Sequence, residues 1–155
     1  MRPTATFTAV DPRTEEVARL LAAHLRFCRD RTPLENAHAL DLVALAAPAV
    51  SVHAARVDGE VLAVGALQDL GGSHLELKSM HVAASARRLG LGRAMLEHLL
   101  GVARDRRCTR VSLETSAADD FAPARALYRA AGFTACGPYG SYEASPQACF
   151  MTLAP

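Results

Sequence analysis

Two glycines one residue apart lie among three arginines in the stretch ARRLGLGRA, residues 86–94, directly before a segment with a helical hydrophobic pattern. The first N–H groups of a helix have no partner within it and lie at the positive end of its dipole, so they can hold phosphate oxygens. Glycines let a ligand approach the backbone closely, and arginines add positive charge. The stretch therefore predicts a phosphate site formed by Arg87, Arg88, Gly90, Gly92 and Arg93.

The spacing of this glycine turn separates several kinds of phosphate site. A Walker loop ends in Gly-Lys-Ser/Thr, whereas Gly92 is followed by Arg93 and Ala94, which excludes that type. A dinucleotide fingerprint needs a third glycine, where this chain has Met95, and an early parallel β-α-β unit. A simpler interpretation stays open, in which Gly90 only permits a tight turn and the arginines form a solvated face.

Eleven elements are predicted around this turn from hydrophobic periodicity and turn signals, in the order β-α-α-β-β-β-α-β-α-β-β. Asp58-Gly59 is a hairpin signal between two of the strands. The order predicts an α/β fold with a mixed, mostly antiparallel central sheet, helices on both faces, and a single domain over residues 1–155. We expect strands over 4–10, 50–57, 60–67, 74–82, 109–115, 133–137 and 147–153, and helices over 11–28, 34–46, 91–104 and 121–131.

Composition narrows the class of protein. The 17 basic and 16 acidic residues give a formal charge of +1, which predicts no general attraction to nucleic acid or to an anionic membrane. No apolar run approaches the ~20 residues of a membrane span, and no signal peptide is recognisable, so we expect a cytoplasmic protein. The four cysteines form no CxxC pair and the six histidines no HExxH motif, so no metal is predicted.

Two stretches of the chain resemble signatures of the GNAT superfamily of N-acyltransferases. Arg87-x-x-Gly90-x-Gly92-Arg93-Ala94 resembles its acyl-CoA pyrophosphate loop, and ARALYRAAGF, residues 124–133, resembles its second signature, A-x-x-L-Y-x-x-x-G-F. The predicted element order matches this superfamily's fold over nearly the whole chain. More narrowly, PLENAHALDLVALAAP, HLELKSMHV, SLETS and GPYGSY resemble a bacterial subgroup labelled indole-acetic-acid acetyltransferase-like.

The resemblance implies an acetyl-CoA-dependent N-acetyltransferase that acts on a primary amine of a small molecule by direct transfer in a ternary complex, without a cysteine intermediate. It also implies a set of contacts for the cofactor. Backbone groups of Met80, His81 and Val82 would pair with the pantetheine arm. The pyrophosphate would lie against Arg87, Arg88, Leu89, Gly90, Leu91, Gly92 and Arg93, and Tyr128 would lie near the thioester.

The resemblance also gives candidates for acid and base catalysis. Glu76 lies six residues before Val82, where some family members carry a general base, although it is equally placed for a strand-face ion pair with Lys78. Weaker base candidates are His74, His81 and Glu114. Tyr128 matches the signature tyrosine, whose hydroxyl can protonate the thiolate, or it packs as an aromatic residue.

One position departs from the family pattern. Many family members carry an asparagine seven residues before the signature tyrosine, and this chain has Phe121 there. A cofactor contact is therefore missing or supplied by Asp119 or Asp120.

The acceptor site is expected to involve the N-terminal helices and the segment from Gly137 to Gln147. The candidate contacts are His38, Tyr139 and Tyr142, although the two tyrosines also fit an ordinary exposed turn. The basic residues Arg26, Arg29, Arg31 and His38 favour an acceptor that carries a carboxylate. Two alternative functions stay open, a non-catalytic acyl-CoA-binding regulatory module and transfer to a protein N-terminus or lysine. A homodimer joined through C-terminal strands is also expected from the resemblance.

Overall fold

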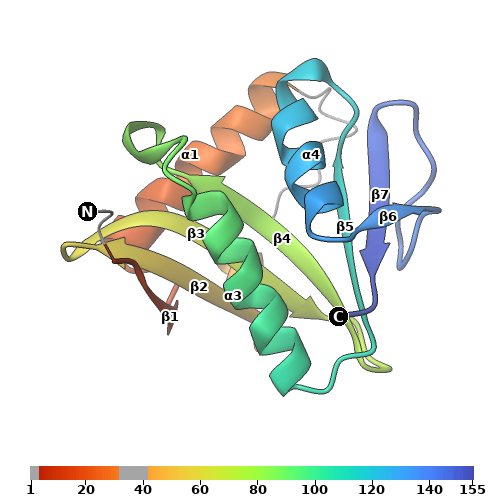
Figure 1. The fold of residues 1–155 in the computed structure, drawn as a ribbon, viewed down its shortest axis with the longest axis horizontal. Helices are drawn as coiled ribbons and strands as arrows, with labels where there is room; N and C mark the ends of the chain where they lie inside the picture. The colour runs from red at the N-terminus through yellow and green to blue at the C-terminus, as the bar shows by residue number, and fades with distance from the viewer. Residues whose placement is uncertain (1–3, 32–41) are drawn as a thin grey trace.

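The structure, a computed structural model, describes residues 4–31 and 42–155. Seven strands form one sheet in the order β1-β2-β3-β4-β5-β7-β6 (Figure 1). The strands are β1 (Thr6–Val10), β2 (Val50–Val57), β3 (Glu60–Asp69), β4 (His74–Val82), β5 (Arg110–Ser116), β6 (Thr134–Cys136) and β7 (Ala148–Leu153). The helices are α1 (Glu15–Arg31), α2 (Leu42–Leu45), α3 (Leu91–Asp105) and α4 (Ala122–Ala130). In these described ranges no helix is long and apolar enough to cross a membrane.

The predicted fold class is confirmed. Every strand pair is antiparallel except β4 with β5, which is parallel. The hairpin between β2 and β3 turns at Asp58 and Gly59, which have φ angles of 51° and 82°. Two positive φ angles are what a two-residue hairpin turn requires, and Asp and Gly tolerate them best.

Helices cover both faces of the sheet, each over its own hydrophobic core. On one face α3 buries a complete apolar stripe made of Leu91, Met95, Leu96, Leu99, Leu100 and Ala103. This stripe recurs with the helical period, as the sequence predicts, and packs with Tyr128 of α4 in the same core. On the other face Val17 and Leu21 of α1 pack with Leu45 of α2 against β2 and β3.

Several predicted boundaries differ from the observed ones or lie partly outside the described residues; α1, for example, ends at Arg31 rather than near Cys28. The first helix begins at Glu15 rather than near Asp11, because the Asp11 carboxylate accepts a hydrogen bond from the backbone N–H of Arg13 and forms a turn there. The strand β6 ends at Cys136, before Gly137-Pro138, because proline has no N–H for the ladder. The second helix was expected over 34–46, of which 34–41 lie outside the described residues and Leu42–Leu45 is helical.

The sheet opens between its two parallel strands. Pairing of β4 with β5 covers only 74–76 with 110–112, and beyond Glu76 and Ser112 the two strands separate. The partner β3 pairs Ala66 with Lys78 but Val64 with His81, so one extra β4 residue lies opposite Gly65. Ser79 in this bulge has a φ of 55°. A bulge bends its strand, which helps to direct β4 away from β5.

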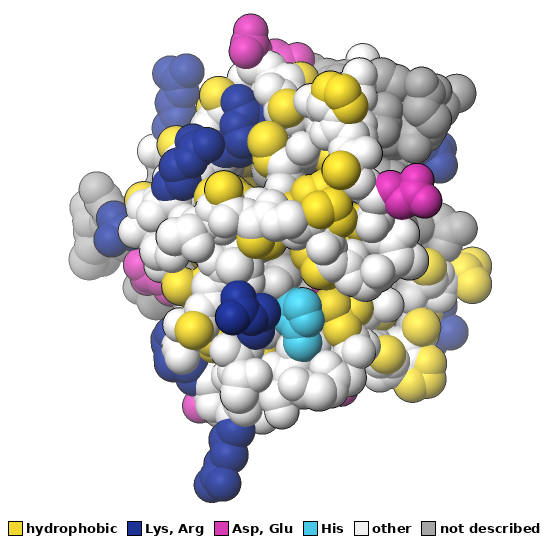
Figure 2. All heavy atoms as spheres, turned by 90° about the vertical axis from the view of Figure 1, so that its right-hand side faces the viewer, with side chains coloured by type: hydrophobic (Ala, Val, Ile, Leu, Met, Phe, Trp, Pro, Cys, Tyr) yellow, Lys and Arg dark blue, Asp and Glu magenta, His cyan; other side chains and the backbone are white. Residues whose placement is uncertain are grey.

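The edge formed by β6 and β7 lies to the right in Figure 1 and faces the viewer in Figure 2. Basic side chains occur at several separate places on this face, interspersed with hydrophobic and uncharged ones (Figure 2).

Candidate active site

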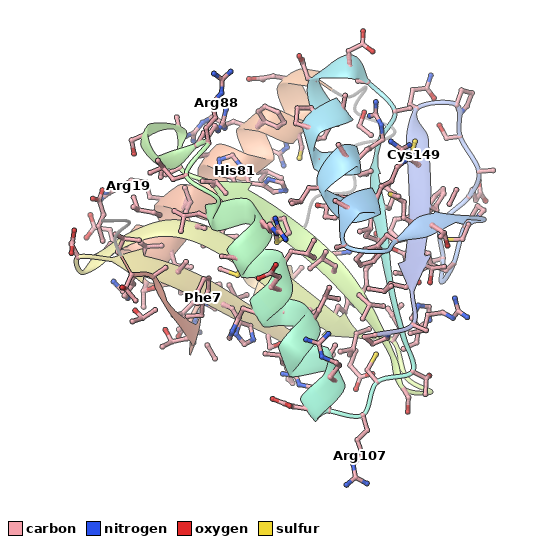
Figure 3. All side chains as sticks on the ribbon, in the orientation of Figure 1. Phe7, Arg19, His81, Arg88, Arg107 and Cys149 are labelled. Carbon is pink, nitrogen blue, oxygen red and sulfur yellow. The ribbon has the colours of Figure 1, made fainter. Side chains whose placement is uncertain are left out.

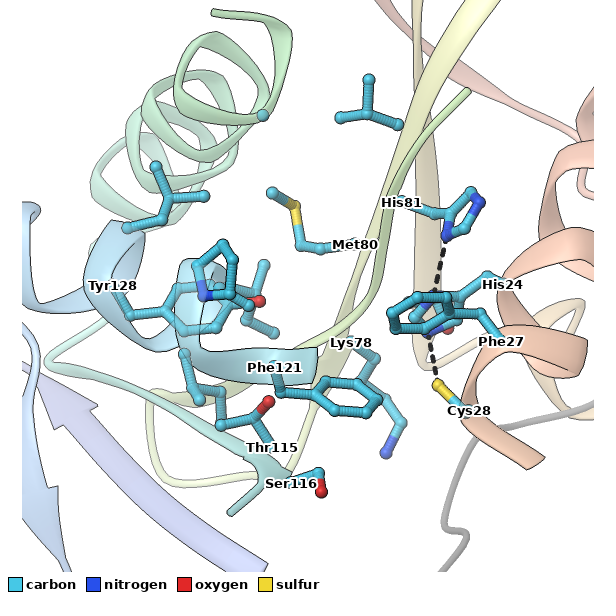
Figure 4. A pocket seen from close by; sticks show the side chains of 18 of the residues that line it. His24, Phe27, Cys28, Lys78, Met80, His81, Thr115, Ser116, Phe121 and Tyr128 are labelled. Carbon is cyan, nitrogen blue, oxygen red and sulfur yellow. Dashed lines mark hydrogen bonds between the residues drawn. The ribbon is translucent and has the colours of Figure 1, made fainter. Parts of the chain in front are cut away.

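A cavity of about 790 Å³ lies where β4 and β5 separate (Figure 4). Helix α1 borders it on one side and α4 on the other, and the N-terminus of α3 lies at one end. Its polar and aromatic lining includes His24, Phe27, Cys28, Glu76, Lys78, His81, Glu114, Asp120, Phe121, Tyr128, Tyr142 and Gln147. Most of the residues singled out in the sequence therefore meet at this opening of the sheet.

The glycine turn forms the α3 end of the cavity. Gly90 is the N-cap residue of α3, with a φ of 82° and no side-chain cap, and Arg88 has a φ of 66°. The cavity is lined by all the predicted loop residues except Leu89, whose side chain is 59% exposed. Figure 3 shows Arg88 extending outward from this turn. The turn thus presents helix N–H groups and guanidinium groups at one opening, which suits a polyphosphate.

Predicted strand contacts for the cofactor also border the cavity. Met80, His81 and Val82 all line it, just after the bulge at Ser79. Arg87 bridges this strand and α1, because its Nε lies 3.5 Å from the carbonyl oxygen of Val82 and its guanidinium carbon lies 5.8 Å from the ring centre of Phe27.

Tyr128 lies on α4 across the cavity from β4 (Figure 4). Its side chain is buried, and its ring packs edge-on against Phe133 at 5.9 Å between centroids. Burial raises the pKa of Tyr128 to about 12, with a smaller contribution from Cys28. The phenol therefore keeps its proton at neutral pH, as a proton donor must.

Glu76 is buried in a network of four polar side chains. Lys78 Nζ donates to Glu76 Oε1 at 2.6 Å, and the hydroxyl of Tyr139 donates to Glu76 Oε2 at 2.6 Å. Lys78 Nζ also donates to the hydroxyl of Tyr142 at 3.1 Å. Burial and the nearby Glu76 carboxylate raise the pKa values of Tyr139 and Tyr142, so both phenols stay neutral. The ion pair considered in the sequence is thus present, and tyrosines from a distant segment complete it.

Two histidines and a cysteine form a chain along the α1 side of the cavity (Figure 4). His24 Nδ1 lies 3.3 Å from His81 Nδ1, and Cys28 Sγ lies 3.5 Å from His24 Nε2. Burial lowers the pKa of both histidines to about 4, so both are neutral at pH 7. His24 and Cys28 are not among the predicted site residues, although their spacing of four residues on a helix is a detectable signal.

Several other predicted residues lie apart from the cavity lining. Tyr139 bonds Glu76 but does not line the cavity, and its ring lies 5.9 Å from that of Phe150 and 5.7 Å from that of His74. His74 itself bonds Ser112 Oγ through Nε2 at 2.7 Å. Arg26 and Arg29 are exposed on α1 and do not line the cavity. Nothing is described of His38 or of the side chain of Arg31.

Phe121, at the position where many family members carry an asparagine, makes an aromatic contact. Phe121 is buried, and its ring lies 5.1 Å from that of Phe27 on α1. Of the two acidic residues considered as replacements, Asp120 lines the cavity and Asp119 does not.

Comparison with known proteins gives consistent matches. The model of the family described as Acetyltransferase (GNAT) matches residues 15–133. The chain is 37% identical over 137 residues to the Uncharacterized N-acetyltransferase YsnE of Bacillus subtilis, covering 88% of this chain and 91% of that protein. It is 35% identical over 150 residues to the IAA acetyltransferase of Azospirillum brasilense, covering 96% and 97%.

A solved structure of a GNAT family acetyltransferase from Elizabethkingia anophelis, with acetyl-CoA bound, has the same fold. Its TM-score is 0.71 at 13% identity, with coverage of 97% of this chain and 98% of that one.

Proposed function

The chain belongs to the GNAT acetyltransferase family, and we propose that it moves the acetyl group of acetyl-CoA to the primary amine of a small molecule, by direct transfer in a ternary complex. The observation that carries this proposal is that one cavity joins the turn at the start of α3, the separated part of β4 and Tyr128 of α4. The acetyl-CoA complex of the Elizabethkingia anophelis protein, which has the same fold, supports this choice of acyl donor.

In this proposal the cofactor lies along the opening between the strands. Backbone N–H groups and arginines of residues 87–93 hold the pyrophosphate, and the backbone at Met80, His81 and Val82 pairs with the pantetheine arm. An amide N–H of β4 near the bulge then polarises the thioester carbonyl, which stabilises the oxyanion that forms in the transition state.

The chemical step needs one proton acceptor and one proton donor. A free ammonium group has a pKa near ~10, so the acceptor must first lose a proton. We assign the acceptance of this proton to the Glu76 carboxylate. The neutral nitrogen attacks the carbonyl carbon, the C–S bond breaks, and Tyr128 donates its phenolic proton to the departing thiolate. The phenolate then takes the second proton from the former amine. The products are the amide, free CoA and a proton on Glu76.

The decisive experiment combines acetyl-CoA binding with CoA release from a panel of primary amines. We expect Tyr128→Phe to lower kcat by about 100-fold, the usual contribution of a general acid, while the Kd of acetyl-CoA stays within about twofold. Calorimetry measures the Kd, and a thiol reagent measures released CoA.

Three outcomes would contradict the proposal. Tight acetyl-CoA binding without CoA release by any amine would favour a non-catalytic binding module. Transfer only to peptide N-termini or lysines would favour a protein acceptor. Full activity of Tyr128→Phe would remove Tyr128 from the chemical step.

A further inference from the structure

The unusual feature of the cavity lining is the buried ion pair of Glu76 and Lys78. The two side chains are only 4% and 9% exposed, and their charged atoms lie 2.6 Å apart. Removing two charges from water is costly, and a buried pair is often no more stabilising than apolar residues of the same size. A role in ligand recognition explains a charged pair here better than fold stability does.

The hydrogen bonds of this pair limit what Glu76 can do before a ligand arrives. Each of its oxygens already accepts a short bond, one from Lys78 and one from Tyr139. A substrate ammonium group that approaches Glu76 must therefore compete with Lys78 for Oε1. This oxygen becomes available to the acceptor when Lys78 gains another anionic partner.

Lys78 is suitably placed to gain such a partner. An ammonium group has three N–H donors, and in the described part of the chain its side chain makes two hydrogen bonds, to Glu76 and Tyr142. Figure 4 shows Lys78 reaching from β4 into the cavity, toward Phe121 and Ser116. Glu114 of β5 also lines the cavity. Among the described residues, this part of the cavity therefore brings the Lys78 ammonium close to acidic side chains, a combination that suits a ligand carrying both charges.

We propose that the acceptor is an amino acid or a similar amine with a neighbouring carboxylate, and that this carboxylate binds Lys78 and loosens its bond to Glu76. The inference rests on the proposed function. Glu76 Oε1 then accepts a proton from the acceptor's ammonium group, and the chemical step proceeds as described above. The sequence predicts a specificity for carboxylated acceptors from Arg26, Arg29, Arg31 and His38. Of these, Arg26 and Arg29 do not line the cavity, His38 and the side chain of Arg31 lie outside the described residues, and the proposal uses Lys78.

The test uses matched trios of acceptors that share one side chain. One trio is L-phenylalanine, L-phenylalaninamide and phenethylamine, and the corresponding trios of the other standard amino acids complete the panel. For the trio that the enzyme uses most efficiently, we expect kcat/KM of the acid to exceed that of its amide and that of its decarboxylated amine by at least about 30-fold. Lys78→Met should raise KM for the acid by a similar factor and remove the preference, whereas Lys78→Arg should keep part of it.

A second measurement covers the case in which Lys78→Met folds poorly because Glu76 is left unpaired. The double variant Glu76→Gln/Lys78→Met removes both charges, and its binding of the acid and the amide in the presence of CoA is measured by calorimetry. We expect wild type to prefer the acid and the double variant to show no preference, with acetyl-CoA binding unchanged. A retained preference in either variant would overturn the role of Lys78.

Failure of this inference is distinguishable from failure of the proposed function. Equal or better use of the amide and the amine by wild type would overturn the inference alone, since acetyl transfer itself would be demonstrated. The absence of CoA release with every trio and with every other amine of the panel, despite acetyl-CoA binding, would overturn both.

Discussion

At the scale of single residues, Cys28 tests whether transfer is direct. Its sulfur lies 3.5 Å from a neutral His24 and lines the cavity, which resembles the pairing of a nucleophile with its base. Direct transfer nevertheless predicts that Cys28→Ser keeps kcat within about threefold. A folded variant that binds acetyl-CoA but has lost turnover, together with an acetylated Cys28 in wild type by mass spectrometry, would instead establish a covalent intermediate.

The same thiol also reports on the position of the cofactor. If acetyl-CoA occupies the cavity, it should slow alkylation of Cys28 by iodoacetamide by at least about tenfold. Cys136 is the internal control, because it lies on β6 away from the cavity lining and is similarly half-buried. Peptide mass spectrometry follows both sites in one sample. Equal protection of the two cysteines, or protection of neither, would contradict the proposed cofactor position.

At the scale of elements, the close packing opposite the bulge in β4 predicts that a methyl group added at Gly65 is destabilising. A Cβ at Gly65 would lie 2.7 Å from Leu99 Cδ1 and 2.9 Å from Met80 Sδ, so Gly65→Ala must displace one of these side chains. We expect a loss of about 1–3 kcal/mol in the free energy of unfolding, the usual range for overpacking, and weaker acetyl-CoA binding because Met80 lines the cavity. Urea unfolding and calorimetry measure the two effects.

Gly137→Ala is the matched control for this substitution. A Cβ at Gly137 would meet nothing within 4 Å, and this glycine does not have a positive φ. We expect its unfolding free energy and its acetyl-CoA affinity to equal those of wild type. The two variants could instead lose unfolding free energy and acetyl-CoA affinity equally. The effect of Gly65→Ala would then be a general cost of replacing glycine in a strand or loop, and not the result of a contact with Met80.

Local patterns were sufficient to predict most elements, but not the opening of the sheet. The apolar stripe of α3 and the Asp58-Gly59 hairpin depend on neighbours in sequence, so periodicity and turn chemistry identify them. The separation of β4 from β5 after three residue pairs depends on contacts between distant segments. Similarly, Lys78 follows from Glu76 by the two-residue period of a strand, whereas Tyr139 lies 63 positions along the chain and was not predicted as its partner.

At the scale of the whole molecule, two pairs of histidines join distant elements. His24 contacts His81 across 57 positions, and His53 of β2 contacts His98 of α3 across 45 positions, at 2.9 Å between ring nitrogens. Metal-ligand spacing in the sequence cannot reveal such pairs, because the partners lie far apart along the chain. In the described part of the chain His53 Nε2 is the one buried side-chain nitrogen or oxygen atom without a hydrogen-bond partner.

These pairs predict that the protein loses stability in mild acid. Burial, followed by the nearby His98, lowers the pKa of His53 to about 4, while an unfolded histidine titrates near ~6.5. Above pH 6.5 both states are neutral at this site, and between about pH 6.5 and 4 only the unfolded state binds the proton. The free energy of unfolding therefore falls by about 1.4 kcal/mol per pH unit in this window, or by about 2 kcal/mol between pH 6.5 and 5.

The variant His53→Gln isolates this contribution, because glutamine is polar but does not titrate. Urea unfolding at pH 7 and at pH 5 measures how much unfolding free energy is lost on acidification. This loss should be smaller in the variant than in wild type by about 2 kcal/mol. His24 and His81, whose pKa values are also lowered to about 4, remain in the variant and account for a further part of the acid sensitivity. An identical loss in wild type and variant would mean that His53 gains a proton in the folded state near its ordinary pKa. A protonated His53 would then donate its Nδ1–H to His98 Nε2, which requires that His98 stays neutral.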